Sequence, residues 1–343
     1  MTKKQTLTYL SSTSYTNIGN LFIDIGTNIA FQKAIHKMGG DYNLIGVGGY
    51  NCFYSATKNL SYLNPIWHTL FRFGEKHISK DKVVAQEGLL DDKNAFALFP
   101  EIDSHIFIIP GCVLTIPFIR IYGNLIKKAA QKKESKIVFY ASSGDIYSNR
   151  EVSHVKKFLE DIKPYAIVAR DNVAYENYHD YATHSYNGID AGFFTNYLEL
   201  DKIGLDLTDY VVLTFDKYQN KRLAEDLQAN ELADKEILFC SHVPVPELDL
   251  YGVPRYKGKY LISDNPLDYI LLYSNAAEVH TDRVHACVIS LSHGTKCKLY
   301  SKSPRIELFK SIGVSDVSKG ERIDQNKIRM LEEEQIKFIS EII

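Results

Sequence analysis

The sequence predicts an α/β protein built from two Rossmann-like domains that face a cleft. Short apolar runs alternate with longer amphipathic stretches, small or polar residues follow several of these runs, and a second strand–helix series begins after residue 200. Such alternation is typical of parallel sheets flanked by helices. Ligands of open parallel sheets bind beyond the carboxyl ends of the strands, so residues at those ends are the first candidates for function.

Strands and helices are expected where apolar residues recur at the corresponding period. The expected strands are 42–47, 105–109, 136–140, 165–169, 209–214, 236–240, 277–280 and 296–300. The expected helices are 21–37, 113–132, 151–161, 172–181, 220–233, 266–274, 284–292 and 306–312.

A domain boundary is expected near residue 200, because segment 188–206 has weak periodicity and a new strand–helix–strand series follows it. The expected parts are a first Rossmann-like domain over 1–200, a second over 201–320 with Arg283 and His285, and a charged amphipathic C-terminal helix over 321–343. This last helix either packs back on the first domain or lies in solvent.

The composition is that of an ordinary globular protein, with 343 residues, of which 45% are hydrophobic and 24% charged. A net charge of −2 gives no overall attraction to nucleic acid or anionic lipid, so affinity for an anion must come from locally placed arginine or lysine. We find neither a signal peptide nor a run of about 18 apolar residues, which predicts a cytoplasmic protein without a transmembrane segment.

The cysteines do not indicate a disulfide framework or a metal site. They are five in number, scattered, and without CxxC spacing, which predicts reduced and mostly buried thiols. No HExxH motif, His/Cys cluster or paired-carboxylate spacing suggests a bound metal ion. The run Gly46-Val47-Gly48-Gly49 does not match GxGxxG, so we exclude a dinucleotide-binding loop.

The segment 277–294 carries the strongest functional signal. A short apolar strand ends near Val279, Thr281 and Asp282 offer capping side chains, and an apolar-periodic helix follows. Arg283 and His285 then lie on the first turn of a helix just beyond a strand. A guanidinium, an imidazole and free helix-start N–H groups together suit an anion that undergoes proton transfer.

Arg170 follows the expected strand 165–169, so two arginines occupy strand ends in different domains. If the domains face each other, Arg170 and Arg283 reach one doubly anionic ligand from opposite walls, through directional guanidinium contacts. The alternative is that each arginine forms a surface ion pair with its neighbour, Asp171 or Asp282, which contributes little. The spacing alone leaves both interpretations open.

Small and polar residues follow other strands and are candidates for lining the cleft. They include Gly46, Gly48 and Gly49, Pro110, Gly111 and Cys112, the run from Ser142 to Asp145, and Asp171. His242 follows the strand 236–240 and is a weaker candidate. The histidines expected to be structural are His179, His184, His280 and His293.

Four motifs give the chain a family resemblance. They are Asn17-Ile18-Gly19-Asn20, the pair Arg170-Asp171, Asp190 in YNGIDAGFF, and Thr281-Asp282-Arg283-Val284-His285-Ala286. On these motifs, over most of its length, the chain resembles the polysaccharide pyruvyl transferase family. It departs from the family where Asn20 replaces an acid and where only Gly111 is left of a glycine-rich segment.

The resemblance implies a fold similar to GT-B glycosyltransferases, with phosphoenolpyruvate as donor substrate and no cofactor. The implied product is a pyruvate ketal that bridges two hydroxyls of a sugar in an exopolysaccharide or capsule. It makes His285 the general acid/base and Arg170 and Arg283 the donor-binding residues, with the first domain on the acceptor side. The possible cleft-lining residues are Asn17, Gly19, Gly111, Ser143, Asp171 and His242. A lipid-linked acceptor would place the protein at the inner face of the membrane; the oligomeric state stays open.

Two other functions remain compatible with the residues. Arginines in the same cleft also suit the diphosphate of a nucleotide sugar, which would make the protein a GT-B glycosyltransferase. The missing acid at Asn20 is compatible with a non-catalytic member that binds a glycan. Release of inorganic phosphate from phosphoenolpyruvate separates pyruvyl transfer from both.

Overall fold

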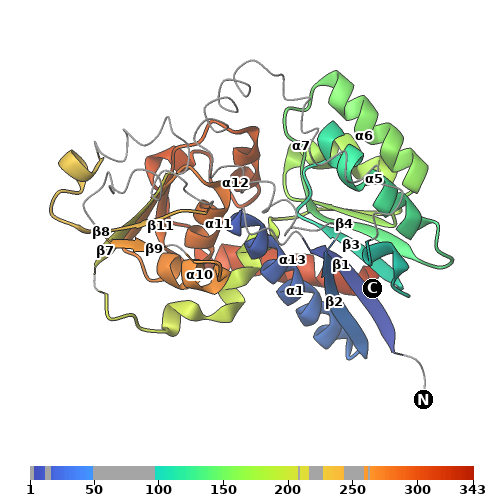
Figure 1. Cartoon of the computed structure of the whole chain (residues 1–343), viewed down its shortest axis with the longest axis horizontal. Coiled ribbons are helices and arrows are strands. Elements are labelled where there is room, and N and C mark those ends of the chain that lie inside the picture. The colour runs from blue at the N-terminus through green and yellow to red at the C-terminus, as the bar shows by residue number, and fades with distance from the viewer. Residues whose placement is uncertain are drawn as a thin grey trace, which may run out of the picture.

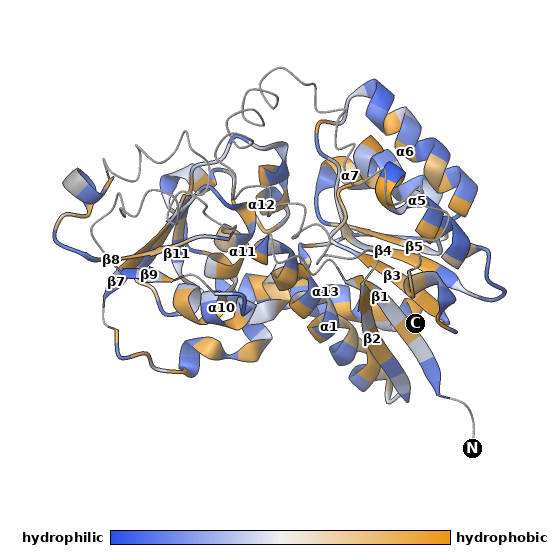
Figure 2. Cartoon of the chain, viewed as in Figure 1, coloured by the Kyte–Doolittle hydropathy of each residue, from blue (hydrophilic) through white to orange (hydrophobic). Residues whose placement is uncertain are grey.

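The structure is a computed structural model that describes residues 4–11, 17–48, 97–207, 209–215, 227–242, 259–261 and 263–343. Two parallel sheets lie side by side, each with helices packed against it, and α1 and α13 lie between them (Figure 1). The central strands of both sheets are strongly hydrophobic, whereas the outer faces of the surrounding helices are hydrophilic (Figure 2). Gly49, Cys52 and the first residues of the expected helix 220–233 lie outside the described residues.

The first sheet has the strand order β2-β1-β3-β4-β5-β6, and all its pairings are parallel. Its strands are β1 (Gln5–Ser11), β2 (Tyr42–Gly48), β3 (Ile106–Pro110), β4 (Lys136–Ser142), β5 (Ala166–Ala169) and β6 (His184–Asn187). The sequence predicted four of these strands and missed β1 and β6. β1 contains the polar residue Thr8, which the fold buries completely, and β6 is a short polar strand at the sheet edge.

The helical elements that accompany this sheet follow its strands along the chain. They are α1 (Ile18–Met38), η2 (Phe99–Glu101), α5 (Ile116–Ala130), α6 (Asn149–Ile162), α7 (Asn172–Tyr178), η3 (His179–Tyr181), η4 (Ala191–Leu198) and η5 (Leu200–Lys202). The expected helix from residue 113 begins later because Thr115 caps it, accepting the N–H of Phe118 at 3.3 Å. Pro117 stands in the first turn of α5, where its missing N–H costs nothing.

The second sheet has the order β11-β10-β7-β8-β9 and is also parallel throughout. Its strands are β7 (Tyr210–Thr214), β8 (Glu236–Cys240), β9 (Lys259–Leu261), β10 (Glu278–Thr281) and β11 (Lys296–Leu299). The helical elements here are η7 (Leu227–Glu231), α10 (Pro266–Ser274), α11 (Val284–Ser292), η8 (Pro304–Glu307), α12 (Leu308–Ser311) and η9 (Val317–Lys319). The sequence missed the short edge strand β9. The expected helix 306–312 is divided between η8 and α12.

The last helix, α13 (Gln325–Ile342), packs against α1 and reaches the first sheet. Its buried Gln335 donates to the hydroxyl of Tyr140 at 2.8 Å and accepts the N–H of Ile189 at 2.7 Å. One hydrophobic core cluster runs from the first sheet through α1, η4 and α13 into the second sheet. The two sheets are therefore joined by a continuous apolar core.

α1 and η4 are packed unusually closely. A Cβ on Gly26 of α1 would lie only 1.8 Å from the carbonyl oxygen of Ala191, the first residue of η4. Only glycine permits this approach of two backbones. Because η4 also packs against α11, α1 and α11 both border η4.

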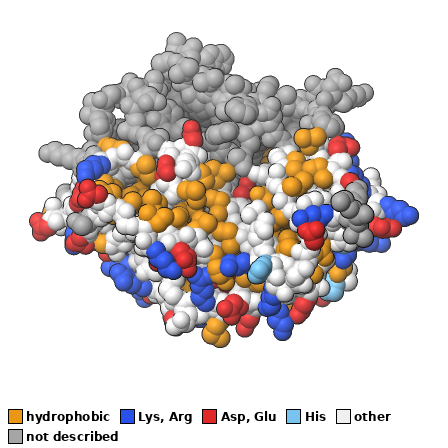
Figure 3. All heavy atoms as spheres, turned by 90° about the horizontal axis from the view of Figure 1, so that it is seen from below, with side chains coloured by type: hydrophobic (Ala, Val, Ile, Leu, Met, Phe, Trp, Pro, Cys, Tyr) orange, Lys and Arg blue, Asp and Glu red, His pale blue; other side chains and the backbone are white. Residues whose placement is uncertain are grey.

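Seen from below, apolar side chains gather across the middle of this face, with Lys, Arg, Asp and Glu side chains around them (Figure 3). In the part of the chain that the structure describes, no helix combines the length and the apolar character needed to cross a bilayer.

Candidate active site

The turn from β10 into α11 places Arg283 and His285 at the carboxyl edge of the second sheet. Thr281 is the last residue of β10, and its hydroxyl accepts the N–H of Arg283 at 2.9 Å. The cap position itself belongs to Arg283, not to Thr281 or Asp282 as the sequence suggested, and the Arg283 side chain makes no capping bond. The first N–H groups of α11 have no partner within the helix, which makes its start favourable for an anion.

The His285 ring is largely enclosed, with 15% of the side chain exposed. Its Nε2 lies 3.9 Å from Oδ2 of Asp190 and makes no hydrogen bond within the described part of the chain. Burial lowers the pKa of His285 to about 4, against an upward pull from Asp190 and with smaller downward contributions from Arg170, Arg305 and Arg283. The imidazole is thus neutral at pH 7 before any ligand binds.

Asp190 is the carboxylate that faces this ring. It precedes η4 and is completely buried, and its Oδ1 accepts the N–H of Gly192 at 2.8 Å. Its Oδ2 accepts from Nη1 of Arg170 at 2.7 Å. Asp190 therefore connects the end of the first sheet to His285 on the second.

The sequence predicted that Arg170 stands on an open wall of a cleft. In the structure its side chain is buried instead. It is 1% exposed, and its Nη2 donates to the hydroxyl of Ser143 at 2.7 Å in addition to the Asp190 contact. Only Nε lacks a partner among the described residues. The alternative prediction of a surface pair with Asp171 is also wrong, since both residues are buried and Asp171 caps α7 through the N–H of Ala174 at 2.8 Å.

The start of α1 closes another side of the His285 environment. Asn17 caps the helix by accepting the N–H of Gly19 at 3.1 Å, and the N–H of Ile18 donates to the carbonyl of His242 at 2.9 Å. A Cβ on Gly19 would lie 3.1 Å from Nδ1 of His285. Asn20 accepts from Nδ2 of Asn17 at 3.4 Å. The Asn17–Asn20 motif is thus brought directly against the imidazole, a contact that spacing alone does not reveal.

His242 lies behind this group rather than on an open surface. It is 1% exposed, and its Nε2 is hydrogen-bonded to the hydroxyl of Tyr273. Burial lowers its pKa well below the usual value, and the charges of Arg283 and of His285, when protonated, add to that effect. His242 is close enough to the site to sense its charge.

The remaining cleft candidates have packing roles in the described structure. Gly111 has φ +55 and its Cα faces Ile23 of α1, where a Cβ would lie 2.5 Å from a side-chain carbon. Ser143 holds the guanidinium of Arg170 and is itself 1% exposed. Of the six candidates, Gly19 approaches His285 and Asn17 caps the same helix start, Ser143 and His242 lie behind the site, and Gly111 and Asp171 have packing or capping roles elsewhere.

The sequence analysis did not predict that Asp190 and Arg305 belong to the surroundings of the site. Asp190 was recognised as part of a motif, but its contact with Arg170 and His285 was not expected. Arg305 lies in η8 beyond the end of β11, with its Nε 3.9 Å from Oδ1 of Asp145. The criterion that selected Arg170, an arginine shortly after a strand, would also have selected Arg305.

His280 and His179 are hydrogen-bonded to neighbouring groups, and the described cysteines are buried. Nδ1 of His280 is hydrogen-bonded to the Tyr300 hydroxyl at 2.9 Å, and Nδ1 of His179 to the Tyr175 carbonyl at 2.9 Å. The described cysteines, Cys112, Cys240, Cys287 and Cys297, are all buried. Over the described ranges, no group of three or more His, Cys, Asp or Glu side chains is arranged to hold a metal ion.

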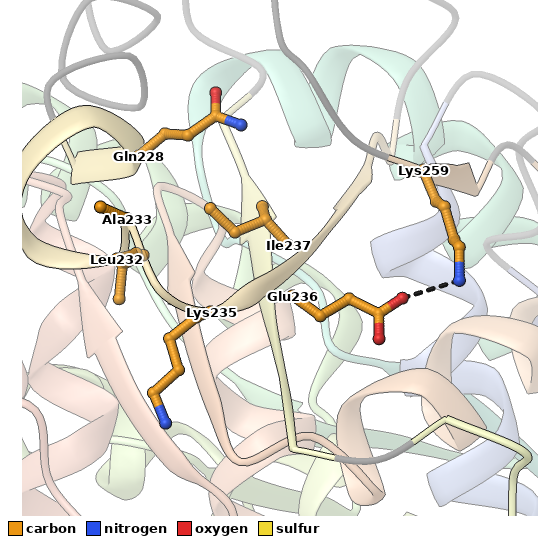
Figure 4. A pocket seen from close by; sticks show the side chains of 7 residues that line it. All are labelled: Gln228, Leu232, Ala233, Lys235, Glu236, Ile237 and Lys259. Carbon is orange, nitrogen blue, oxygen red and sulfur yellow. Dashed lines mark hydrogen bonds and ion pairs between the residues drawn. The ribbon is translucent and has the colours of Figure 1, made fainter.

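A separate hollow of about 360 Å³ lies at the opposite edge of the second sheet (Figure 4). It borders the first residues of β8 and β9, where Glu236 and Lys259 form an exposed ion pair of 2.7 Å. Ligands of parallel sheets bind at the carboxyl ends of strands, so the edge with Arg283 and His285 is the better candidate.

Comparison with known proteins agrees with this architecture. A UDP-GlcNAc 2-epimerase from Neisseria meningitidis, bound to UDP-GlcNAc, has a TM-score of 0.53 at 11% identity, covering 97% of this chain and 100% of that one. A candidate UDP-N-acetylglucosamine 2-epimerase from Listeria monocytogenes has a TM-score of 0.53 at 10% identity, covering 99% and 91%. At such low identity these likenesses show the fold alone. They confirm the predicted GT-B-like arrangement of two Rossmann-like units.

The family is shown by the sequence itself. No curated protein matches the chain. The profile described as polysaccharide pyruvyl transferase matches residues 17–298, a span that includes the Asn17 motif, Arg170, Asp190 and the Arg283–His285 segment. The chain therefore belongs to the polysaccharide pyruvyl transferase family.

Proposed function

We propose that this protein transfers the enolpyruvyl group of phosphoenolpyruvate to two hydroxyls of a sugar, forming a pyruvate ketal in a cell-surface polysaccharide. The observation that carries the proposal is the position of His285. Its enclosed imidazole lies on the first turn of α11, next to Arg283, and faces the Asp190 carboxylate. Family membership supports transfer to a polysaccharide acceptor. No cofactor is needed for this reaction, because the donor itself supplies the reactive group.

Donor binding is assigned to the cationic edge. Arg283 and the first N–H groups of α11 suit the phosphate or the carboxylate of the donor. Arg170 lies behind this edge, where its terminal nitrogens donate to Asp190 and Ser143 and its Nε has no partner among the described residues. Its neutral pairing with Asp190 fixes the carboxylate that faces His285.

In the proposed reaction, His285 is protonated and donates this proton to the methylene carbon of the donor, which becomes a methyl group. The adjacent carbon becomes electrophilic, and the oxygen of one sugar hydroxyl bonds to it while its proton passes to His285. The bond from this carbon to the phosphate oxygen then breaks. The second hydroxyl closes the ketal, and its proton leaves with the phosphate.

The low pKa of the empty site fits this order of events. At pH 7 His285 is neutral because burial lowers its pKa to about 4. The negative charges of the donor oppose the three arginines and raise this pKa, so donor binding and protonation of His285 are coupled. The protonated imidazole of His285 is then present only when the donor is bound.

The experiment measures inorganic phosphate release from phosphoenolpyruvate by the purified protein, with and without a panel of oligosaccharide acceptors, free and lipid-linked. We expect release only when donor and a suitable acceptor are both present. A lipid-linked acceptor would put the reaction at the inner face of the membrane. Turnover of a nucleotide sugar instead, or glycan binding without turnover of either donor, would contradict the proposal.

A further inference from the structure

Three arginines follow strand ends on the two sides of the candidate site, but they are not equivalent. Arg170, after β5, uses both terminal nitrogens on Asp190 and Ser143 and is 1% exposed. Almost complete burial makes Arg170 unsuited to a bidentate contact with a ligand that enters from solvent. A donor with both a carboxylate and a phosphate offers a second anionic group besides the one that Arg283 binds. Of the three arginines, Arg305 is then the remaining candidate to bind that group.

Arg305 lies on the segment that crosses from the second sheet to the first. It stands in η8 between β11 and α12, and buried Leu308 and Phe309 anchor α12. The hydroxyl oxygen of Ser311 in α12 lies 3.3 Å from the backbone carbonyl oxygen of Arg170, and it also approaches the carbonyl oxygen of Leu308 at 2.7 Å. The η8–α12 segment therefore lies beside the end of β5, which Arg170 follows.

The Arg305 side chain is weakly held, and its charge acts on His285. Its Nε lies 3.9 Å from Oδ1 of Asp145, with 44% of the Arg305 side chain and 33% of the Asp145 side chain exposed. Its charge reaches His285, whose pKa it helps to lower, and partial burial followed by the charge of Arg170 lowers the pKa of Arg305 itself. A loose, exposed pair of this kind contributes little to stability.

We infer that Arg305 is the second donor-binding arginine, which together with Arg283 holds the carboxylate and phosphate of phosphoenolpyruvate across His285. This inference rests on the proposed function and replaces Arg170 in that role. Arg170 is then a positioning residue that fixes Asp190. Arg305 exchanges its loose contact with Asp145 for a charge-assisted contact with the donor.

The test measures phosphoenolpyruvate binding by isothermal titration to the full-length protein and to the variants Arg305→Ala, Arg305→Lys and Asp145→Asn. We expect Arg305→Ala to weaken binding about 10- to 100-fold, the range for a hydrogen bond to a charged group. Arg305→Lys keeps the charge without the planar fork and gives an intermediate loss. Asp145→Asn leaves binding unchanged or tighter, because it removes only the competing carboxylate.

The controls separate the possible failures. Arg150→Ala removes an exposed arginine of α6 and should bind the donor as the wild type does. If Arg305 matters only through Asp145, Asp145→Asn weakens binding as much as Arg305→Ala and the inference is wrong. Equal affinity of wild type and Arg305→Ala overturns the inference alone. A wild type that binds no phosphoenolpyruvate overturns the proposed function and the inference with it.

Discussion

Arg170 and Asp190 form an ion pair of 2.7 Å in which both side chains are almost completely buried, 2% and 0% exposed. The same Asp190 oxygen lies 3.9 Å from Nε2 of His285. The pair joins the end of β5 to the start of η4 and sets the carboxylate that faces the imidazole. The other terminal nitrogen of Arg170, Nη2, donates to the hydroxyl of Ser143 at 2.7 Å.

Removing the carboxylate from this pair should be strongly destabilising. Asp190→Asn leaves a buried guanidinium without its counter-charge, and we expect a loss of about 3–5 kcal/mol in the free energy of unfolding. Denaturant unfolding of the two proteins measures the difference. The matched control is Asp161→Asn, which breaks the exposed pair of 2.8 Å with Lys127 and should cost about 0–1 kcal/mol. Equal losses for the two variants would show that burial is not what makes the Arg170–Asp190 pair important.

Replacing the imidazole should abolish turnover while donor binding survives. His285→Gln keeps a polar side chain but cannot carry the proton, and loss of a general acid/base typically lowers kcat by about 10²–10⁴-fold. Phosphate release and titration with phosphoenolpyruvate report the two properties separately. His154→Gln, at an exposed position of α6, is the control and should behave as wild type. Retained kcat in His285→Gln would rule out the proposed role.

Gly19 should be needed for the position of His285 rather than for the stability of α1. A methyl group at Gly19 would lie 3.1 Å from Nδ1 of His285, so Gly19→Ala should displace the ring and lower kcat. Alanine favours helices over glycine by about 1 kcal/mol, and this gain opposes the cost of displacing the ring. The melting temperature should therefore change little. Gly204→Ala, where nothing lies within 4 Å of the new carbon, is the control. A variant with full activity would show that the ring has room to move.

Donor binding at pH 7 should take up a proton. The pKa of His285 is about 4 in the empty site, because burial and the arginines outweigh Asp190, so the ring starts neutral. An anionic donor raises this pKa. Isothermal titrations in buffers of different ionisation enthalpy then give different apparent binding enthalpies. In His285→Gln the buffer dependence should disappear; if it persists, another group takes up the proton.

The stability of α13 should depend on pH through Glu332. This residue is completely buried, accepts from Nδ2 of Asn196 at 2.8 Å, and burial raises its pKa to about 8. A raised pKa means that the folded state holds a proton that the unfolded state releases near pH 4.5. The stabilisation is therefore present at low pH and is lost as the pH rises through about 8.

The variant Glu332→Gln lacks this dependence. The melting temperature of this variant minus that of wild type should rise between pH 5 and about pH 8 and then level off. Loss of the charged contact with Arg329 at 3.4 Å adds an offset to this difference. Thermal unfolding of both proteins across this range is the measurement. A difference that stays constant with pH would show that Glu332 is ionised throughout.

The alternation of strands and helices was predictable because it depends on local hydrophobic periods. The elements missed are those in which local pattern and burial disagree. β1 buries Thr8 completely in its interior, and β6 and β9 are short edge strands whose pairing comes from backbone hydrogen bonds. No side-chain period identifies strands of that kind.

The sequence by itself determined which residues stand at the strand ends: Arg170 after β5, and Arg283 and His285 after β10, since chain order fixes these positions. Only the tertiary structure decided which groups each charged side chain contacts. Arg170 meets Asp190 across the fold, where the close contact of Gly26 with Ala191 packs the start of η4 against the middle of α1. Burial and ion pairing depend on distances across the whole fold, and these distances are set by packing between segments far apart in the chain.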